Sequence, residues 1–308
     1  MNILVTGATG RVGRALMVRL ARSHQVRGLD QAPSSTAHWV GDVGDAALLR
    51  RALRSVDAVV HAAALHAPQV GRVPDTEFQR INVDATRTLA EAACAAGVGH
   101  LLYTSTTALY GDAATPLGAA GWVDETLAPQ PRTVYHRSKL AAEQLLTRHA
   151  DAGAFELTIL RMSRCFPETA PQMACARLHR GVDARDVADA HALALDTARP
   201  GSRVYVISGA TPFLPDDAAA LKADAPAVLR QRAPALVQAF ADHGWPLPAS
   251  IDSVYSPALA QRELRWQPRH GFADVLRQLD DGSPEVLPPG FPVAGQGLRL
   301  PGQAEDCK

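Results

Sequence analysis

The stretch TGATGRVG, residues 6–13, follows a strand-like apolar run and leads into a helical pattern. Gly7 permits the tight turn, Gly10 lets the backbone approach a pyrophosphate, and Gly13 allows close contact between helix and sheet. The N-terminus of the helix would offer N–H donors and a partial positive charge to the phosphates. An ordinary strand–helix turn can carry the same glycines. The strand before the loop and the helix after it nevertheless supply the context that predicts a dinucleotide-binding loop.

Asp30 ends the second predicted strand, 23 residues after Gly7. A carboxylate at this point can hydrogen-bond the adenosine ribose hydroxyls and repel a 2′-phosphate, which favours NAD over NADP. Arg11, inside the glycine loop, keeps NADP open as the second choice. Asp30 could also serve only as a turn carboxylate at the strand end.

Two further segments follow predicted strands at the same edge of the sheet. Asp42 and Val43 follow the third strand, where a carboxylate could meet the adenine amino group. An acid at a helix N-terminus would explain Asp42 equally well. Ala62, Ala63 and Ala64 follow the fourth strand, and their small side chains would let a cofactor lie close to the backbone. Packing of small residues would also explain them.

Strand-like runs and helical patterns alternate through the first two thirds of the chain. The predicted strands span Ile3–Thr6, Gln25–Asp30, His38–Val40, Ala58–His61, Leu101–Thr104, Leu157–Arg161 and Arg203–Ile207. The predicted helices span Val12–Arg22, Asp45–Leu53, Thr76–Ala96, Val134–Ala150 and Asp186–Asp196. This alternation implies βαβ units, a parallel sheet and right-handed crossovers.

We therefore predict an α/β protein, a Rossmann-type doubly wound parallel sheet with a small interleaved C-terminal substrate lobe. The NAD-binding domain would comprise residues 1–161 and 186–209. The lobe would comprise residues 162–185 and 210–281, where prolines punctuate short helical stretches. Residues 282–308 are rich in Pro and Gly and are expected to form an extended or disordered tail.

The composition excludes several classes of function. The formal net charge is zero and aromatic residues make up 5%, so no basic field argues for nucleic acid. No window approaches 18 uninterrupted apolar residues and no leader-like segment precedes the first strand, so we expect a cytoplasmic protein that does not enter membranes. The four cysteines lack metal-type spacing, so no metal site is expected.

Tyr135 and Lys139 form a second informative pattern, because only three of the 31 basic residues are lysine. With five tyrosines, the chance that any Tyr precedes a Lys by four is about 5 × 3/308, roughly 0.05. On a helix the two residues share a face, and an ammonium beside a phenol lowers the phenol's pKa from about 10. The pattern predicts a proton-transferring tyrosine, with an accidental pair on a solvated helix as the alternative.

Four hydroxyl side chains follow one another at residues 104–107, where the fifth predicted strand ends. Ligands of an open parallel sheet sit outside the carboxyl ends of its strands. A hydroxyl there could therefore hold a substrate oxygen while Tyr135 transfers a proton. Threonine is also common in strands for packing reasons, so at least two of the four are expected to be structural.

Four segments together resemble the extended short-chain dehydrogenase/reductases: TGATGRVG, Asp30, YTSTTALYG at 103–111 and YHRSK at 135–139. More narrowly, the chain is similar to the NAD-dependent epimerase/dehydratase branch over about residues 1–210. SPALAQRELRWQP at 256–268 matches the C-terminal pattern of that branch. The resemblance implies the fold above, NAD as the cofactor and a homodimer formed through the helices at residues 76–96 and 134–150.

The resemblance also implies roles for single residues. Tyr135 would transfer the proton, and Lys139 would lower the pKa of Tyr135 and hold the nicotinamide ribose. Thr106 would be the catalytic hydroxyl, with Ser105 beside the nicotinamide. Asn82 would support the site, unless it is only a buried polar residue on an apolar helix. The expected cofactor-binding residues are Gly7, Gly10, Arg11, Val12, Gly13, Asp30, Asp42, Val43, Ala62, Ala63, Ala64, Asn82, Tyr135 and Lys139.

Two departures from the family pattern bear on the reaction. Family 4,6-dehydratases place an acidic pair directly after the catalytic threonine. This chain has Thr107 and Ala108 there, which argues against dehydration. Sugar-nucleotide epimerases have a long segment after the sixth strand, whereas only 24 residues separate Arg161 from Asp186 here. The short segment leaves less surface to grip a nucleotide.

The segment SRCFPE, residues 163–168, instead resembles uronate dehydrogenases, which oxidise free sugar acids. Arg164, Arg177 and Arg180 could bind a carboxylate or phosphate through a planar fork, or could be surface charges. His66, on the loop after the fourth strand, could line the pocket or have no role.

We therefore predict an NAD-dependent oxidoreductase that moves a hydride to or from a secondary alcohol or ketone of a sugar or sugar-like substrate. An epimerase that acts by transient oxidation with retained NAD is the alternative, because the same residues serve both reactions. A non-catalytic dinucleotide sensor on the same fold is a third possibility.

Overall fold

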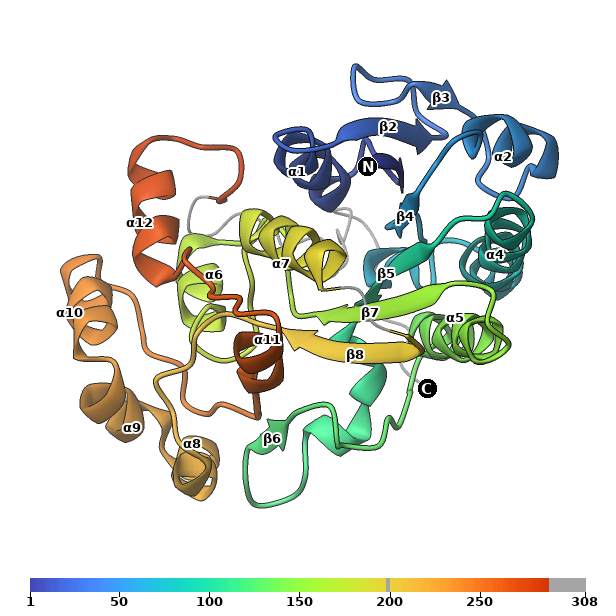
Figure 1. Cartoon of the computed structure of the whole chain (residues 1–308). Coiled ribbons are helices and arrows are strands. Elements are labelled where there is room, and N and C mark those ends of the chain that lie inside the picture. The colour runs from blue at the N-terminus through green and yellow to red at the C-terminus, as the bar shows by residue number, and fades with distance from the viewer. Residues whose placement is uncertain (198–199, 288–308) are drawn as a thin grey trace, which may run out of the picture.

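The computed structural model describes residues 1–197 and 200–287, which form one large sheet beside a smaller lobe (Figure 1). The sheet has seven parallel strands in the order β3-β2-β1-β4-β5-β7-β8. The order reverses between β1 and β4, the point at which doubly wound sheets bind ligands. The strands are β1 (Asn2–Thr6), β2 (Gln25–Asp30), β3 (Trp39–Val40), β4 (Ala58–His61), β5 (His100–Thr106), β7 (Glu156–Met162) and β8 (Ser202–Ile207). The predicted Rossmann-type fold is confirmed.

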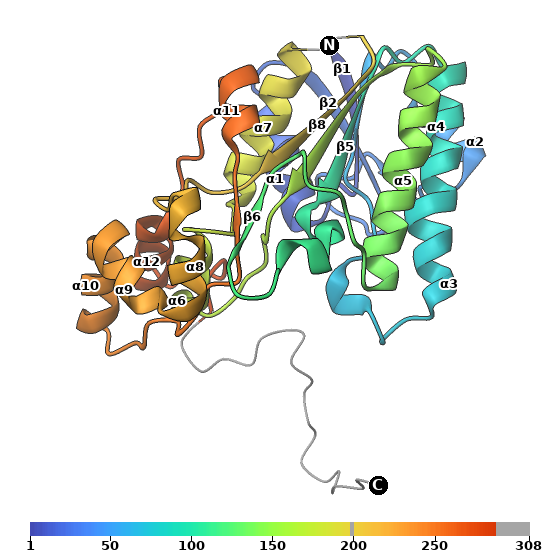
Figure 2. The ribbon, with the colours of Figure 1, turned by 90° about the horizontal axis from the view of Figure 1, so that it is seen from below.

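Helices cover both faces of the sheet (Figure 2). On one face α1, α7 and α11 share a hydrophobic core with the strands, and on the other face α2, α4 and α5 form a second core. Val59 and Val60 of β4 are fully buried in these two opposite cores, as continuous apolar strands of parallel sheets usually are. The helices are α1 (Arg11–Leu20), α2 (Ala46–Ala52), α4 (Ala85–Ala95), α5 (Val134–Asp151), α7 (Ala184–Asp196) and α11 (Ala258–Glu263).

The helix predicted at residues 76–96 contains an irregular turn. It begins as α3 (Asp75–Phe78), passes through a π-helical turn at Gln79–Asp84 and continues as α4. Single π turns inside α-helices occur frequently at functional sites. Here the turn carries Asn82, which is 1% exposed and bonds to the loop after β4 and to α5.

The smaller lobe has its own hydrophobic core, formed by five short helices and a two-stranded parallel sheet. Its elements are α6 (Ala170–Ala176), α8 (Ala218–Ala223), α9 (Ala225–Arg232), α10 (Pro234–Asp242), α12 (Phe272–Asp280), β6 (Gly121–Val123) and β9 (Ser253–Tyr255). Sequence patterns missed β6 and β9 because three residues are too few to show a period. The lobe core also takes in Ala120 and Trp122, which lie outside the predicted lobe ranges.

The first residues of the predicted tail pack against the rest of the protein. Val286 is 4% exposed in the core of the lobe. Leu287 pairs with Thr169, and its N–H donates to the carbonyl of Glu168 at 2.8 Å. Up to residue 287 the predicted tail is therefore packed against the lobe, because this short apolar stretch finds a hydrophobic partner. The remainder of the predicted tail, 288–308, lies outside the described residues.

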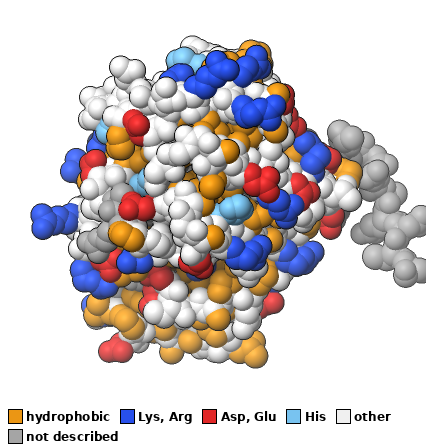
Figure 3. Space-filling view, turned by 45° about the vertical axis from the view of Figure 1, so that its right-hand side comes forward, with side chains coloured by type: hydrophobic (Ala, Val, Ile, Leu, Met, Phe, Trp, Pro, Cys, Tyr) orange, Lys and Arg blue, Asp and Glu red, His pale blue; other side chains and the backbone are white. Residues whose placement is uncertain are grey.

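The distribution of charged side chains on the surface agrees with the zero net charge of the sequence. On the face shown in Figure 3, acidic and basic side chains are interspersed. No helix within residues 1–197 and 200–287 is both long and apolar enough to span a membrane.

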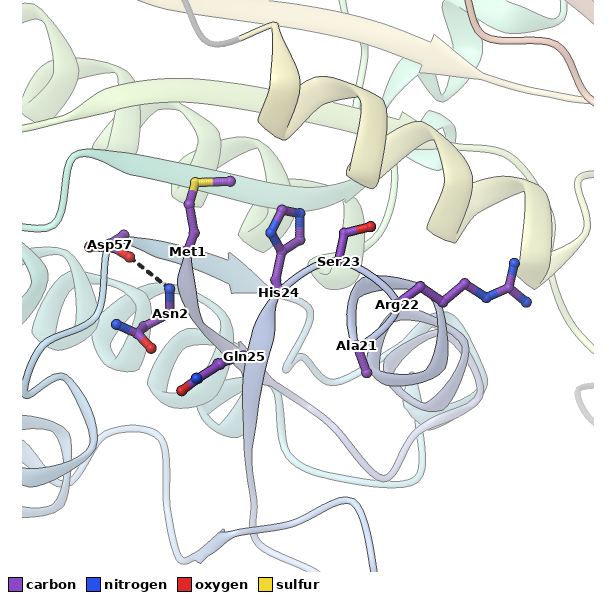
Figure 4. Close-up of a pocket in the computed structure, with 8 residues that line it drawn as sticks. All are labelled: Met1, Asn2, Ala21, Arg22, Ser23, His24, Gln25 and Asp57. Carbon is purple, nitrogen blue, oxygen red and sulfur yellow. Dashed lines mark hydrogen bonds between the residues drawn. The ribbon is translucent and has the colours of Figure 1, made fainter.

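A hollow of about 440 Å³ lies at the edge where β1 and β2 begin (Figure 4). Its lining includes Asn2, His24 and Gln25, and the Asn2 N–H donates to Asp57 at 2.7 Å. This is the amino edge of the sheet. Ligands of doubly wound folds bind at the opposite, carboxyl edge, and the candidate residues gather there.

Candidate active site

The glycine loop lies at the carboxyl end of β1, against the segment that follows β4. Gly7 has φ +71°, and a Cβ on it would lie 2.7 Å from the backbone N of Ala63. A Cβ on Gly13 would lie 1.9 Å from the carbonyl O of Gly7, so both positions require glycine. The N–H of Ala62 donates to the Thr6 carbonyl at 3.2 Å. The structure thus brings the loop and the alanine segment together, and their contact with a cofactor stays a prediction.

Asp30 holds the far side of the glycine loop. Its carboxylate accepts the N–H of Thr9 and the N–H of Ala32, each at 3.0 Å. The side chain is only partly buried. Asp30 is thus a turn carboxylate, as one interpretation held, and it also stands at the end of β2 where a ribose would lie.

Arg11 points toward the other half of the sheet. Its Nη2 lies 2.8 Å from Glu285 Oε2, and its Nε and Nη1 are buried without a partner among the described residues. Burial raises the pKa of the Cys165 thiol to about 11, and the nearby Arg11 charge lowers it in part. Cys165 follows β7, four strands away from β2. Arg11 therefore does not stand beside Asp30 and gives no support to NADP.

Asp42 is held by two contacts of its own. It accepts the N–H of Gly44 at 2.7 Å and pairs with Arg80 at 2.8 Å, and both contacts lower its pKa against the effect of burial. The N-cap of α2 is Asp45, so the interpretation of Asp42 as the helix-terminal acid is wrong. Val43 is 7% exposed in the core, so its side chain serves packing.

The predicted proton-transfer residues come from β5 and from the first turn of α5, which Thr133 caps. The Thr106 side chain lies close enough to the Tyr135 phenol to lower its pKa in part. Ser105 is 2% exposed, and its hydroxyl has no hydrogen-bond partner among the described residues. A buried polar atom without a partner is costly. The orphaned hydroxyl therefore fits a site in which a bound cofactor supplies the missing partner.

Lys139 lies one turn further along α5 and donates to the carbonyl O of Thr104 at 2.9 Å. It is 2% exposed, and burial lowers its pKa to about 7 although the charge of Glu143 acts in the opposite direction. Burial raises the pKa of Tyr135 to about 12, with the nearby Thr106 side chain lowering it in part. The expected lowering of the Tyr135 pKa is therefore wrong for the protein alone, because burial of the phenol outweighs every attraction to its ionised form.

Asn82 joins the loop after β4 to α5. Its Oδ1 accepts the N–H of Leu65 at 2.7 Å, and its Nδ2 donates to the Ser138 hydroxyl at 2.9 Å. That hydroxyl donates to the Tyr135 carbonyl at 2.9 Å. Asn82 is thus bonded into the site rather than merely buried. Ser138 was not among the predicted site residues, although its place in YHRSK, three residues after Tyr135, puts it beside Tyr135 on the helix.

The expected substrate arginines have different surroundings. Arg164 forms a bidentate ion pair with Glu168 and leaves 40% of its side chain exposed. Arg177 is 3% exposed and pairs with Asp183 at 3.0 Å, so its role is structural. Arg180 is exposed and has no ion-pair partner within residues 1–197 and 200–287. The three arginines therefore do not form one anion site, and Arg180 alone is free to bind.

Two more residues border this side of the site. Burial raises the pKa of Tyr255 on β9, and the Arg180 charge is among the contacts that lower it in part. Tyr255 was missed because β9 has no sequence pattern. His66 is exposed to solvent. Neighbouring protein atoms, together with the Lys139 charge, nevertheless lower its pKa. His66 thus lies within range of the Lys139 charge, at the rim of the site.

Comparisons with known proteins agree with this geometry. The sequence model of the NAD dependent epimerase/dehydratase family matches residues 3–177. The chain is 32% identical to an N-acetyl-alpha-D-glucosaminyl-diphospho-ditrans,octacis-undecaprenol 4-epimerase of Escherichia coli O157:H7, over 54% of this chain and 50% of the relative. It is 30% identical to an NAD-dependent glucose-6-phosphate dehydrogenase of Haloferax volcanii, over 46% of this chain and 60% of the relative. The match thus spans only about half the length of these relatives.

Longer matches exist at lower identity. A dTDP-glucose 4,6-dehydratase of Streptomyces antibioticus is 28% identical over 91% of this chain and 92% of its own. The crystal structure of a short-chain dehydrogenase/reductase superfamily protein from Agrobacterium tumefaciens with bound NAD superposes with a TM-score of 0.69. It is 24% identical and covers 90% of this chain and 95% of its own, which bears on the fold alone.

Proposed function

Because this chain belongs to the NAD-dependent epimerase/dehydratase family, we propose that it is an NAD-dependent dehydrogenase or reductase of a sugar or sugar-like substrate. One observation carries the proposal. Tyr135, with the Thr106 side chain near its phenol, lies one helical turn from the buried Lys139, which bonds to Thr104 beside a Ser105 hydroxyl that has no partner among the described residues, at the carboxyl edge of the sheet. Hydride exchange at a carbinol carbon requires a group that exchanges a proton with the oxygen, a fixed cation and a free hydrogen-bonding position.

The chain's residues divide the chemical work. NAD, when bound, supplies the carbon that accepts or returns the hydride. Tyr135 exchanges one proton with the substrate oxygen, so that an alcohol loses a hydride and a proton together on becoming a ketone. Thr106 orients the same oxygen through its hydroxyl, and Lys139 offers further N–H groups to a ribose besides the one donated to Thr104. Asn82 fixes the first turn of α5 that carries Tyr135.

NAD is the cofactor that the site favours over NADP. The glycine loop and the first turn of α1 would take the pyrophosphate, and Asp30 would bind the adenosine ribose. A 2′-phosphate would meet the Asp30 carboxylate, and Arg11 is turned away toward Glu285. Asp42 and the backbone near Val43 would border the adenine, and the segment from Ala62 to Ala64 would border the middle of the cofactor.

The substrate is proposed to be a free sugar acid or sugar phosphate. The chain between β7 and α7 contains a single short helix, α6, which offers little surface for a nucleotide. Arg180 stands near Tyr255 without an ion-pair partner among the described residues. Its guanidinium can take a carboxylate or phosphate through two parallel hydrogen bonds. Arg164 is already paired with Glu168, so it is the weaker candidate.

Epimerisation by transient oxidation is the second candidate, because the chain is 32% identical to the Escherichia coli 4-epimerase over 54% of its length and the same proton-transferring residues would serve both reactions. Dehydration has less support despite the Streptomyces relative. Elimination of water needs an acid–base pair after the catalytic threonine, and Thr107 and Ala108 occupy those positions.

A cofactor balance distinguishes the two candidates. We expect stoichiometric NADH when the enzyme is mixed with NAD⁺ and the right member of a panel of uronic acids, aldose phosphates and nucleotide sugars. Absorbance reports NADH, and NMR of the sugar reports stereochemistry. Inverted stereochemistry without net NADH would overturn the dehydrogenase proposal and establish the epimerase.

The same assay locates the anionic group of the substrate. We expect Arg180→Ala to raise KM by about 10-fold or more, since a charge-assisted bidentate contact is worth about 1.5–3 kcal/mol. Arg164→Ala is the matched control, with a change of less than about threefold. A larger effect for Arg164 than for Arg180 would contradict the assignment.

We also propose a cytoplasmic homodimer formed through α4 and α5. Exposed Arg87 and Glu91 on α4 and exposed Arg137 and Arg148 on α5 would lie at or near such an interface. Light scattering should give twice the mass of the chain, and Glu91→Arg should shift the equilibrium toward monomer by placing like charges opposite one another. A monomeric wild-type protein at micromolar concentration would contradict the dimer.

A further inference from the structure

An aromatic ring lies directly beside the ammonium of Lys139. Its Nζ is 4.0 Å from the centroid of the Tyr103 ring, and Tyr103 is 1% exposed on β5. The same ammonium donates to the carbonyl of Thr104, the next residue along β5. Two consecutive residues of one strand therefore contact the charge, one through its backbone oxygen and the other through its ring face.

The carboxylate nearest to Lys139 is already engaged. Glu143, one turn along α5, is bonded to Arg161 by three hydrogen bonds of 2.7 to 3.3 Å. It acts on the Lys139 charge only through space. No ion pair to Lys139 occurs within the part of the chain that the structure describes. A buried ammonium without a bonded carboxylate needs another source of negative potential, and the face of an aromatic ring is one.

Other titratable groups around the ammonium do not take this place. His61 on β4 is fully buried, and burial together with the Lys139 charge lowers its pKa to about 3, so it stays neutral. At the rim, neighbouring protein atoms and the Lys139 charge also lower the pKa of the exposed His66, to about 4. Tyr135, on α5 itself, remains a phenol because burial raises its pKa to about 12.

The Tyr103 ring is itself fixed from behind. The ring of His61 lies 5.5 Å from it, tilted by 33°. His61 is immobilised at both nitrogens, since Nδ1 lies 2.7 Å from the Thr6 hydroxyl and Nε2 lies 2.9 Å from the Thr86 hydroxyl. Through His61, the Tyr103 ring is thus held against β1 and α4, which limits the positions that the ring can adopt.

We propose that Tyr103 is a positioning residue whose ring face holds the Lys139 ammonium charged and in place for the cofactor ribose and for Tyr135. Its effect on turnover rests on the function proposed above, whereas its effect on Lys139 does not. The ring face, and not the phenol oxygen, is the active part. Phenylalanine should therefore replace Tyr103 with little loss, and an aliphatic residue should not.

The chain is suited to a direct test, because it contains only Lys139, Lys222 and Lys308 as lysines. The test uses full-length protein labelled with ¹³C at lysine Cε and titrated by NMR without substrate, with Lys139→Met to assign the buried signal. In the wild type and in Tyr103→Phe, the Lys139 Hε protons should be shifted upfield by the ring. In Tyr103→Leu the upfield shift should vanish, and the Lys139 titration midpoint should fall by about one pH unit.

Several outcomes overturn the proposal. An ordinary Hε shift in the wild type would show that the ring does not cover the ammonium, even if no variant folds. An unchanged midpoint in Tyr103→Leu, or in Tyr103→Met if the leucine variant does not fold, would do the same. Once a substrate is known, kcat should fall about 10-fold in the aliphatic variant with KM for substrate unchanged. A correct NMR result without turnover on any substrate would count against the proposed function only.

Discussion

Tyr135→Phe is expected to lower kcat by about 10³-fold while leaving the dissociation constant for NAD within about threefold. General acid–base groups contribute about 10²–10⁴-fold, and the substitution removes only the phenolic hydroxyl. The ring, its burial and the fold of α5 remain. Stopped-flow or steady-state NADH kinetics measure the loss, and fluorescence titration measures the binding of NAD.

Tyr205→Phe is the matched control. Its phenol on β8 donates to Glu263 at 3.0 Å, away from the reacting end, so we expect kcat within about twofold of wild type. Loss of that hydrogen bond should cost about 1 kcal/mol of stability. If Tyr135→Phe retained full turnover, the proton would move by another route. If instead the wild type bound NAD and turned over no sugar, the chain would be a dinucleotide sensor.

The pH dependence should reflect the buried phenol. Because burial raises the pKa of Tyr135 to about 12, its neutral form prevails in the free enzyme at every ordinary pH. Alcohol oxidation requires the phenolate, so kcat/KM for oxidation should rise about tenfold per pH unit up to about pH 7, above which Lys139 loses its charge. Carbonyl reduction requires the phenol and should show no such rise. A flat oxidation profile would assign the rate to a group other than Tyr135.

The fold could be predicted because its signals are local. The glycine loop, the buried strands and the amphipathic helices each show their pattern within about ten residues. The features that the sequence patterns did not predict depend on contacts between distant segments. The π turn at Gln79–Asp84 has no pattern of its own, and β6 pairs with β9 across about 130 residues of chain, as their positions in the sequence show. Packing of Val286 into the lobe likewise depends on a surface built elsewhere.

The sequence singles out the residues of the candidate site, but it does not reveal the pKa shifts that their burial produces. Tyr135 and Lys139 follow from a four-residue spacing, yet the direction of the Tyr135 pKa shift depends on burial that no spacing reveals. The ion pair of Arg164 with Glu168 forms in a non-helical segment before α6, so the helical i,i+4 rule could not have predicted it. The pairing of Arg11 with Glu285 joins opposite ends of the chain.

Glu143→Ala is expected to lower the free energy of unfolding by about 3–5 kcal/mol. Glu143 and Arg161 have only 4% and 9% of their side chains exposed, with 2.7 Å between Oε2 and Nη2. Removing one partner leaves a buried guanidinium whose side-chain hydrogen bonds, within residues 1–197 and 200–287, are reduced to one with the Tyr110 hydroxyl at 3.0 Å. An uncompensated buried charge is among the most destabilising single changes. Urea unfolding followed by circular dichroism measures the loss.

The surface pair of Glu77 and Arg80 provides the control, because it has the same chemistry at 39% and 48% exposure. Glu77→Ala should cost less than about 1 kcal/mol, since exposed pairs are screened by water and salt. The double variant Glu143→Leu, Arg161→Met should recover most of the lost stability, because it removes both charges at once. Equal losses in Glu143→Ala and Glu77→Ala would mean that water reaches the buried pair.

Glu143 also supports the Lys139 charge through space, so Glu143→Ala should lower the Lys139 titration midpoint as well. Through its pairing with Arg161, Glu143 thus stabilises the fold, and through space it also favours the charged form of Lys139.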